Sequence, residues 1–194
     1  DAITRGTLSN DDFDGEMDDV SYHIESIEEK GLPIDPINAY NLFAIYLRWC
    51  IEHDLMGEDF LNEYGEVAKQ VKADPASVDL RAFIRDKLNG QIMVPMFNKI
   101  GRAFTSYYYG EPDSPNFPRD IENYALEYLG PEKYYSDEFQ FKAPLFIPFD
   151  EDYYQAMAKV IEERFTNWQG QDFDEDTLEP SELAEALMEY LDCE

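Results

Sequence analysis

Two aspartates and a histidine near the N-terminus come closest, by residue type and spacing, to a chemical site. Asp18, Asp19 and His23 could serve as metal ligands or as a general acid and base. Asp19 and His23 form an i, i+4 pair if this segment is helical. His53 is the second histidine, and no spacing links it to His23. Because a histidine beside carboxylates more often supports structure, we expect Asp18 or Asp19 to cap the first helix while Tyr22 packs.

The letters NDDFDGE at residues 10–16 match the first half of a calcium-binding loop, with oxygen donors at positions one, three and five and glycine at position six. Position twelve, which needs a bidentate glutamate, is Ser21, and no helix is expected before the segment. We therefore interpret residues 1–19 as an acidic flexible arm. The chain carries no zinc pattern, phosphate-binding loop or nucleophile elbow, so no metal ion, cofactor or catalytic residue is expected.

Residues 38–54 are apolar on nearly all sides, which predicts a helix buried by its neighbours, with Asn38 as its N-cap. The polar exceptions share one stripe, in which Arg48 and Glu52 lie four residues apart. A buried arginine needs a carboxylate partner, so we expect these two side chains to form a structural ion pair. Cys50, in the same run, is expected to be a small buried side chain.

Three groups of consecutive tyrosines occur at residues 107–109, 134–135 and 153–154. Consecutive helical residues diverge by about 100°, so at least one tyrosine of each group should be exposed. Exposed tyrosines among carboxylates suit a protein interface, whereas the alternative is a thick aromatic core with hydroxyls at its rim. Both interpretations stay open. The surface residues expected to bind a partner are Tyr108, Tyr109, Glu111, Asp113, Tyr134, Tyr135, Asp150, Glu151 and Asp152.

The charge balance is strongly acidic, with 43 acidic and 15 basic residues and a formal net charge of −28 over 194 residues. Such a surface repels nucleic acid and anionic membranes and attracts basic partners at long range. Aromatic residues make up 15% of the chain, which is far from the composition of an acidic disordered protein. We therefore expect a folded protein that binds a basic protein, with no direct contact to nucleic acid.

Neither a membrane nor an oxidising compartment is indicated. No run approaches the roughly 18 apolar residues of a membrane span. The two cysteines, Cys50 and Cys193, do not make a disulfide framework. A reducing cytoplasm is the simplest setting.

The hydrophobic periodicity predicts a mostly α fold: one compact multi-helix domain over residues 20–170, followed by an acidic linker and short terminal helix over residues 171–194. A proline-rich loop over residues 110–118 interrupts the helices. Residues 130–148 are expected to form an extended loop that docks Phe141 and its apolar neighbours on the core. The expected helices cover residues 38–54, 57–72, 75–89, 93–109, 119–129 and 151–168.

Three sequence motifs carry a family resemblance. They are DDVSYH at residues 18–23, LRWCI at residues 47–51 and RFTNW at residues 164–168. Together they resemble a bacterial family of unknown function, the DUF7832 type, over about residues 17–170; Tyr22 stands where the family often has tryptophan. Some relatives look like immunity proteins beside polymorphic toxins. The resemblance implies kinship of fold and supplies no catalytic residues.

Three functions remain open. The first is an immunity protein that neutralises a cognate bacterial toxin, such as a nuclease, by covering its basic active-site surface. The second is an enzyme or metal-dependent protein that uses Asp18, Asp19 and His23. The third is an acidic nucleic-acid mimic, which would need regularly spaced carboxylates on one face.

Overall fold

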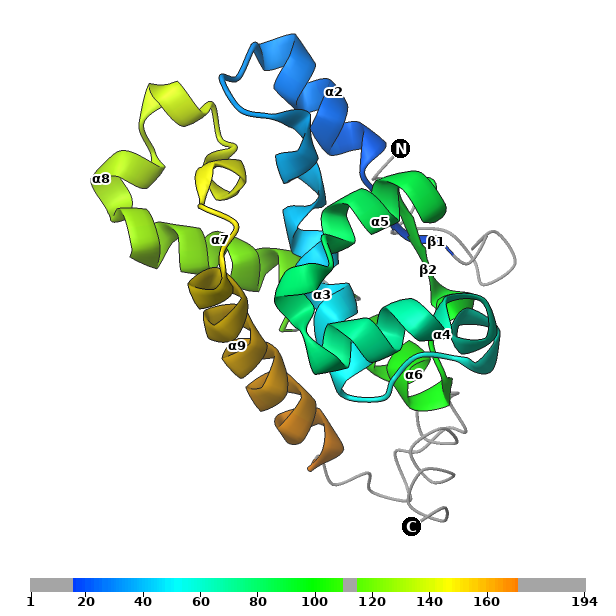
Figure 1. The fold of residues 1–194 in the computed structure, drawn as a ribbon. Coiled ribbons are helices and arrows are strands. Elements are labelled where there is room, and N and C mark those ends of the chain that lie inside the picture. Colours follow the sequence, from blue (N-terminus) through cyan, green and yellow to red (C-terminus); the bar gives the residue numbers. More distant parts are fainter. Residues whose placement is uncertain (1–15, 110–114, 171–194) are drawn as a thin grey trace.

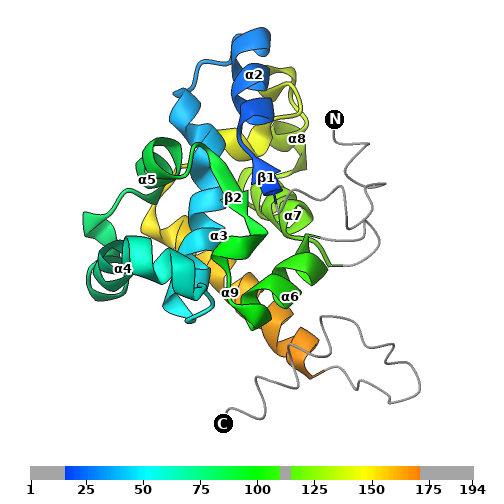
Figure 2. The ribbon, with the colours of Figure 1, turned by 90° about the vertical axis from the view of Figure 1, so that its right-hand side faces the viewer.

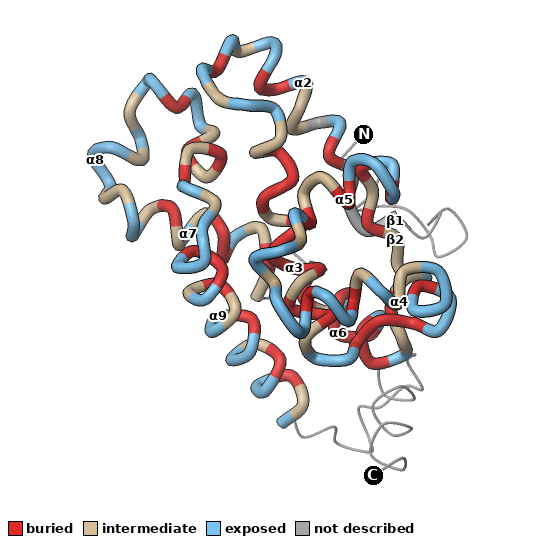
Figure 3. The backbone as a smooth tube through the Cα atoms, viewed as in Figure 1, coloured by how far each residue is buried: buried red, intermediate tan, exposed pale blue. Residues whose placement is uncertain are grey.

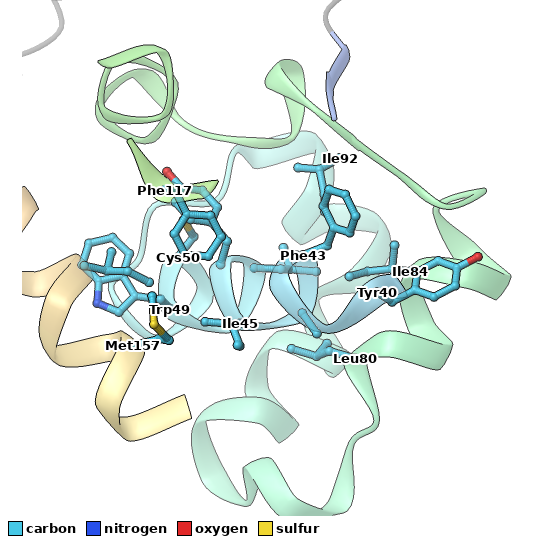
Figure 4. Packing of buried hydrophobic residues seen from close by; sticks show 14 of the residues in the cluster. Tyr40, Phe43, Ile45, Trp49, Cys50, Leu80, Ile84, Ile92, Phe117 and Met157 are labelled. Atoms are coloured by element: carbon cyan, nitrogen blue, oxygen red, sulfur yellow. The ribbon is translucent and has the colours of Figure 1, made fainter. Parts of the chain in front are cut away.

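A buried helix forms the centre of the fold. The computed structural model describes residues 16–109 and 115–170 (Figure 1). At its centre lies α3 (Asn41–Glu52), which buries most of its side chains because its sequence offers almost no polar face. Figure 4 shows its side chains pointing outward into packed neighbours on several sides. Cys50 is fully buried among them, as expected.

The other helices cover α3 from different sides. On one side lie α4 (Glu58–Ala73) and α5 (Leu80–Lys87), and on the other lies α9 (Glu151–Gln169); all three contact α3 (Figure 1). Figure 3 shows that α4 and α9 turn buried residues inward and exposed residues outward. The remaining helices are α2 (Ser21–Lys30), α6 (Lys99–Tyr108), α7 (Phe117–Leu129) and α8 (Pro131–Tyr134).

Side-chain caps set the starts of four helices. Asp79 caps α5, Asn98 caps α6, Asn116 caps α7 and Asp150 caps α9. In each case a side-chain oxygen accepts a hydrogen bond from a backbone N–H of the first turn, for example 2.8 Å from Tyr153 N to Asp150 Oδ1. Asx residues are favoured there because they satisfy backbone donors that have no partner within the helix. Short 3₁₀ turns connect several helices, at Pro36–Tyr40, Pro75–Ser77, Val94–Met96, Asp137–Phe139 and Ala143–Phe146.

The mostly helical fold is confirmed, with α3, α4, α7 and α9 close to their predicted ranges. Two features differ. Residues 130–148 fold into α8 and two 3₁₀ turns rather than an extended loop, and Asn38 lies inside a 3₁₀ turn capped by Asp35 rather than at the start of α3. Residues 1–15, residues 110–114 of the predicted proline-rich loop and the predicted extension 171–194 lie outside the described residues. No helix in the described part is long and apolar enough to cross a membrane.

A small antiparallel ribbon is the main element that periodicity missed. β1 (Glu16–Asp19) pairs with β2 (Gln91–Met93), and Figure 2 shows the two strands side by side. The prediction that residues 16–19 belong to a flexible arm is therefore wrong, as is the predicted helix start at residue 93. The prediction that Asp18 or Asp19 caps α2 is also wrong, because Val20 occupies the N-cap position and its side chain makes no capping bond.

The turn before β2 explains the ribbon. Asn89 and Gly90 both have positive φ, 55° and 73°, which ends α5 and redirects the chain into an extended strand. The Gly90 carbonyl then accepts a hydrogen bond from Val20 N at 3.2 Å, where β1 leads into α2. Ile92 of β2 is 1% exposed and belongs to the same core as α3 (Figure 4).

Aromatic rings join three helices at one end of the core. Phe104 of α6 lies between Trp49 of α3 and Phe165 of α9, with ring centroids 5.7 Å and 4.9 Å away. Trp168 packs on both Phe104 and Phe165, at 5.5 Å and 5.7 Å. The geometries are tilted or edge-to-face, which aromatic rings prefer over face-to-face sandwiches. Phe165 and Trp168 thus bury the C-terminal part of α9 against α6 and α3.

Gly101 permits a close approach of the α6 backbone to Leu55, and replacing it by alanine should be costly. A Cβ at this position would lie 2.4 Å from the Leu55 carbonyl oxygen and 2.9 Å from the Phe97 Cβ. Because backbone must move to relieve such a contact, we expect Gly101→Ala to lower the free energy of unfolding by about 1–3 kcal/mol, measured by urea denaturation.

The matched control is Gly65→Ala in α4. A Cβ there meets nothing within 4 Å, so this variant should be neutral or gain about 0.5–1 kcal/mol. Equal urea midpoints for Gly101→Ala and the wild-type protein would contradict the close-packing argument.

Candidate functional site

Tyr108 was expected on the surface, and this prediction is wrong. The side chain is 0% exposed, and its hydroxyl donates a 2.6 Å hydrogen bond to the buried carboxylate of Asp120. Arg164 of α9 donates to both oxygens of the same carboxylate, at 2.9 Å and 3.0 Å. Burial and the neighbouring carboxylate raise the pKa of Tyr108 well above its usual value. Tyr108 therefore helps to hold α6, α7 and α9 together and is not available to a partner.

The prediction that one tyrosine of each group is exposed also fails for residues 153–154. Tyr153 is 2% exposed because its ring stacks on Tyr124 of α7, with centroids 4.9 Å apart. Tyr154 is 3% exposed and donates a 2.6 Å hydrogen bond to Glu52 of α3. Tyr109 is half-buried, with its ring edge-on to Tyr46 at 5.4 Å. For these residues the aromatic-core interpretation is the correct one.

Arg48 is the centre of a second polar network. The predicted pair with Glu52 is confirmed, at 2.9 Å, and Arg48 also binds both carboxylate oxygens of Glu151 at 2.8 Å each. The guanidinium lies 3.6 Å above the ring centre of Tyr154. Burial opposes the charge, yet the two carboxylates hold the pKa of Arg48 above its usual value, and Arg48 in turn lowers the pKa of Glu151.

This network borders a groove of about 300 Å³ between α3, the start of α5 and the start of α9. Its walls include Ile45, Val78 and Leu80, and Arg81 lies 4.3 Å above the ring of Phe149 at one side. Three residues predicted to bind a partner lie at the start of α9, and two of them have structural roles. Asp150 caps the helix and Glu151 binds Arg48, while Asp152 is exposed in the first turn.

The other predicted tyrosines lie on a different surface, formed by α7 and α8. Tyr135 is 65% exposed, and its ring meets Tyr134 edge-on at 4.8 Å. Tyr134 is half-buried and its hydroxyl donates to Glu122 of α7. Figure 1 shows α7 and α8 on the side of α3 away from α4 and α5. Glu111 and Asp113 lie outside the described residues, so the structure does not place them.

Two further exposed aromatics belong to this part of the chain and were not predicted. Tyr128 is 55% exposed and stacks on Tyr124 one turn earlier, a spacing that the sequence does contain. Phe141 is 87% exposed, so the expectation that it docks on the core is wrong. Its backbone is left-handed (φ 64°), and no glycine or asparagine in the sequence indicates such a turn here. We name the aromatics Tyr128, Tyr134, Tyr135 and Phe141, which follow one another in the segment 128–141, the α7–α8 surface. Phe141 itself lies in the turn after Asp137–Phe139, next to the end of α2.

His23 has a different setting from the one its spacing suggested. Asp18 and Asp19 lie in β1, so the i, i+4 relation of a helix does not apply to them. The His23 ring meets Phe43 edge-on at 6.1 Å, and burial together with the charge of Lys142 lowers its pKa to about 4. Within the part of the chain that the structure describes, no three His, Cys, Asp or Glu side chains gather as a metal site would need.

The fold and these contacts define a mostly helical domain with a short β-ribbon, in which the polar networks cross-link helices. The chain matches the model of the family described as a domain of unknown function, DUF7832, over residues 16–137, and it belongs to that family. The match begins with β1 and extends just past α8, so α9 and its Arg164–Trp168 motif lie beyond it. No curated protein and no solved structure matches the chain.

Removal of the Arg48 charge should destabilise the protein. In Arg48→Gln the half-buried Glu52 loses its ion pair, and Glu151 loses a bidentate partner. We expect a loss of about 2–3 kcal/mol in the free energy of unfolding, less than for a fully buried pair because Glu151 is 57% exposed. Urea denaturation at pH 7 measures this loss.

The control is Arg85→Gln, which removes an exposed arginine that pairs with its neighbour Asp86. This variant should leave the urea midpoint unchanged. If the urea midpoint of Arg48→Gln also equalled that of the wild-type protein, the Arg48 network would not stabilise the fold.

His23 should make stability depend on pH. Its pKa is about 4 in the folded protein and about 6.5 when unfolded, so between these values the unfolded state binds more protons and stability falls as pH falls. Compared with His23→Gln, the wild-type protein should lose about 3 kcal/mol more between pH 7 and pH 4. Carboxylates titrate in both proteins, so parallel pH profiles would contradict this assignment.

Proposed function

We propose that this protein binds a basic protein partner through the α7–α8 surface, and that the partner is a bacterial toxin that it neutralises as an immunity protein. The observation that carries the proposal is a clustering of exposed side chains. Of the four large apolar side chains exposed in the described residues, three lie within residues 128–141: Tyr128, Tyr135 and Phe141. Exposed aromatics that gather in one segment are typical of binding surfaces rather than of scattered surface residues.

Charge supports the same proposal. Residues 122–152 carry eight acidic side chains and two lysines, so the aromatics of this segment stand among carboxylates. Within it the side chains of Glu127, Glu132, Asp137 and Glu138 are exposed. An acidic rim around aromatic anchors favours encounter with a basic surface and disfavours nucleic acid and anionic lipid.

The proposed mechanism is occlusion. A basic active-site cleft, such as that of a nuclease, would be covered by this carboxylate and tyrosine surface, and the aromatic rings would supply most of the binding energy. The carboxylates would set the association rate and partner choice. The proposed setting is the cytoplasm, where such a toxin would act on its own producer.

We expect a tight complex between this protein and the product of the neighbouring gene, with rescue of cell growth from that product's toxicity. Affinity should fall by at least about tenfold when the salt concentration rises tenfold, because the long-range attraction is screened. Tyr135→Ala should weaken the complex at every salt concentration. Isothermal titration calorimetry and a growth assay measure these effects.

Leu61→Ala serves as the matched control, since Leu61 is 44% exposed but lies on α4, away from the α7–α8 surface. It should bind and rescue like the wild-type protein. Absence of both complex and rescue would refute the immunity proposal. Binding that is insensitive to salt would refute its electrostatic part.

A further inference from the structure

The most exposed large apolar side chain in the described residues belongs to a residue with an unfavourable backbone conformation. Phe141 is 87% exposed and has φ 64°, directly after Gln140 with φ 47°. Left-handed backbone crowds the Cβ of any L-residue against its own carbonyl, and a bulky residue there is a clear exception. The chain thus places a phenylalanine in water at a position that suits glycine or asparagine.

Contacts on both sides hold this turn in place. Lys30 at the end of α2 donates its Nζ to the Gln140 carbonyl at 2.7 Å, and Gln140 Nε2 donates back to the Lys30 carbonyl at 3.0 Å. On the other side Lys142 N donates to the carbonyl of Phe139 at 2.8 Å. Phe139 is itself buried against Phe146, with ring centroids 4.6 Å apart. The turn is therefore clamped to α2 and to the core, with Phe141 between the clamped residues.

An exposed apolar ring and a left-handed backbone both destabilise the folded state. Strain of this kind persists where the surroundings impose it and is concentrated at binding sites. Because the clamps fix the backbone, the ring is already presented for contact and little further entropy is lost on binding. We infer that Phe141 is the anchor of the α7–α8 surface and inserts into an apolar pocket of the protein partner.

The chemistry around Phe141 defines the rim of that pocket. Asp137 and Glu138 are exposed just before the turn, whereas the two nearby lysines, Lys30 and Lys142, are half-buried, and the Lys30 ammonium donates to the Gln140 carbonyl. The net charge of the protein is −28. The partner pocket should therefore be apolar at its base and basic at its edge. An anionic lipid surface could accept a phenylalanine but would be repelled by these carboxylates, which favours a protein partner. The inference rests on the proposed function and specifies how its surface binds.

The test compares Phe141→Ala and Phe141→Gly with the wild-type protein. The probe is an inactivated form of the toxin encoded by the neighbouring gene, and Kd is measured by isothermal titration calorimetry. Both variants should raise Kd by at least about thirtyfold, as expected for the loss of an anchor residue. Phe141→Gly should also raise the urea midpoint, because glycine adopts positive φ without strain, whereas Phe141→Ala should not.

Leu61→Ala is again the control and should leave Kd unchanged. If the wild-type protein does not bind the toxin, the proposed function is wrong. If the wild-type protein binds and Phe141→Ala binds equally well, the proposed function stands and the anchor inference is overturned. A Phe141→Gly variant with no rise in its urea midpoint would overturn the strain argument on which the inference is built.

Discussion

The fold depends on the burial of α3, a helix with almost no polar face. Because α3 is apolar nearly all round, neighbours must cover it on several sides, and α4, α5 and α9 do so from different directions. The one charged residue pair within α3 sets a further condition. An element that covers Arg48 and Glu52 must leave their charges with polar partners, and the start of α9 supplies these in Glu151 and Tyr154.

The same arrangement of an arginine, a carboxylate and a tyrosine hydroxyl occurs twice, once near each end of α9. Near the start, Arg48 binds Glu52 while the Tyr154 hydroxyl donates to that carboxylate. Farther along, Arg164 binds Asp120 while the Tyr108 hydroxyl donates to it. In both networks, one carboxylate accepts hydrogen bonds from a guanidinium and from a phenol. The charges of the arginine and the carboxylate therefore compensate each other within each network. Part of the acidic excess is thus used inside the fold rather than on its surface.

Local patterns predicted what depends on local geometry. Helical periodicity located α3 and α9, and i, i+4 spacing predicted the Arg48–Glu52 pair, because both follow from the pitch of a single helix. The hydrogen bond of Tyr108 could not be predicted, since its acceptor Asp120 lies in α7 and is held by Arg164 of α9, 44 residues away. The β-ribbon and the exposure of Phe141 were missed for a related reason: each follows from positive-φ backbone that tertiary contacts stabilise.

The paired hydrogen bonds between Lys30 and Gln140 also determine how load would travel through the molecule. They join residues 110 positions apart, so a pull on the turn at residues 140–141 reaches α2 directly and need not pass back through α8 and α7. The Val20–Gly90 hydrogen bond continues that route from α2 into the ribbon. A displacement of the turn would therefore be transmitted first to α2 and from there to β1 and β2.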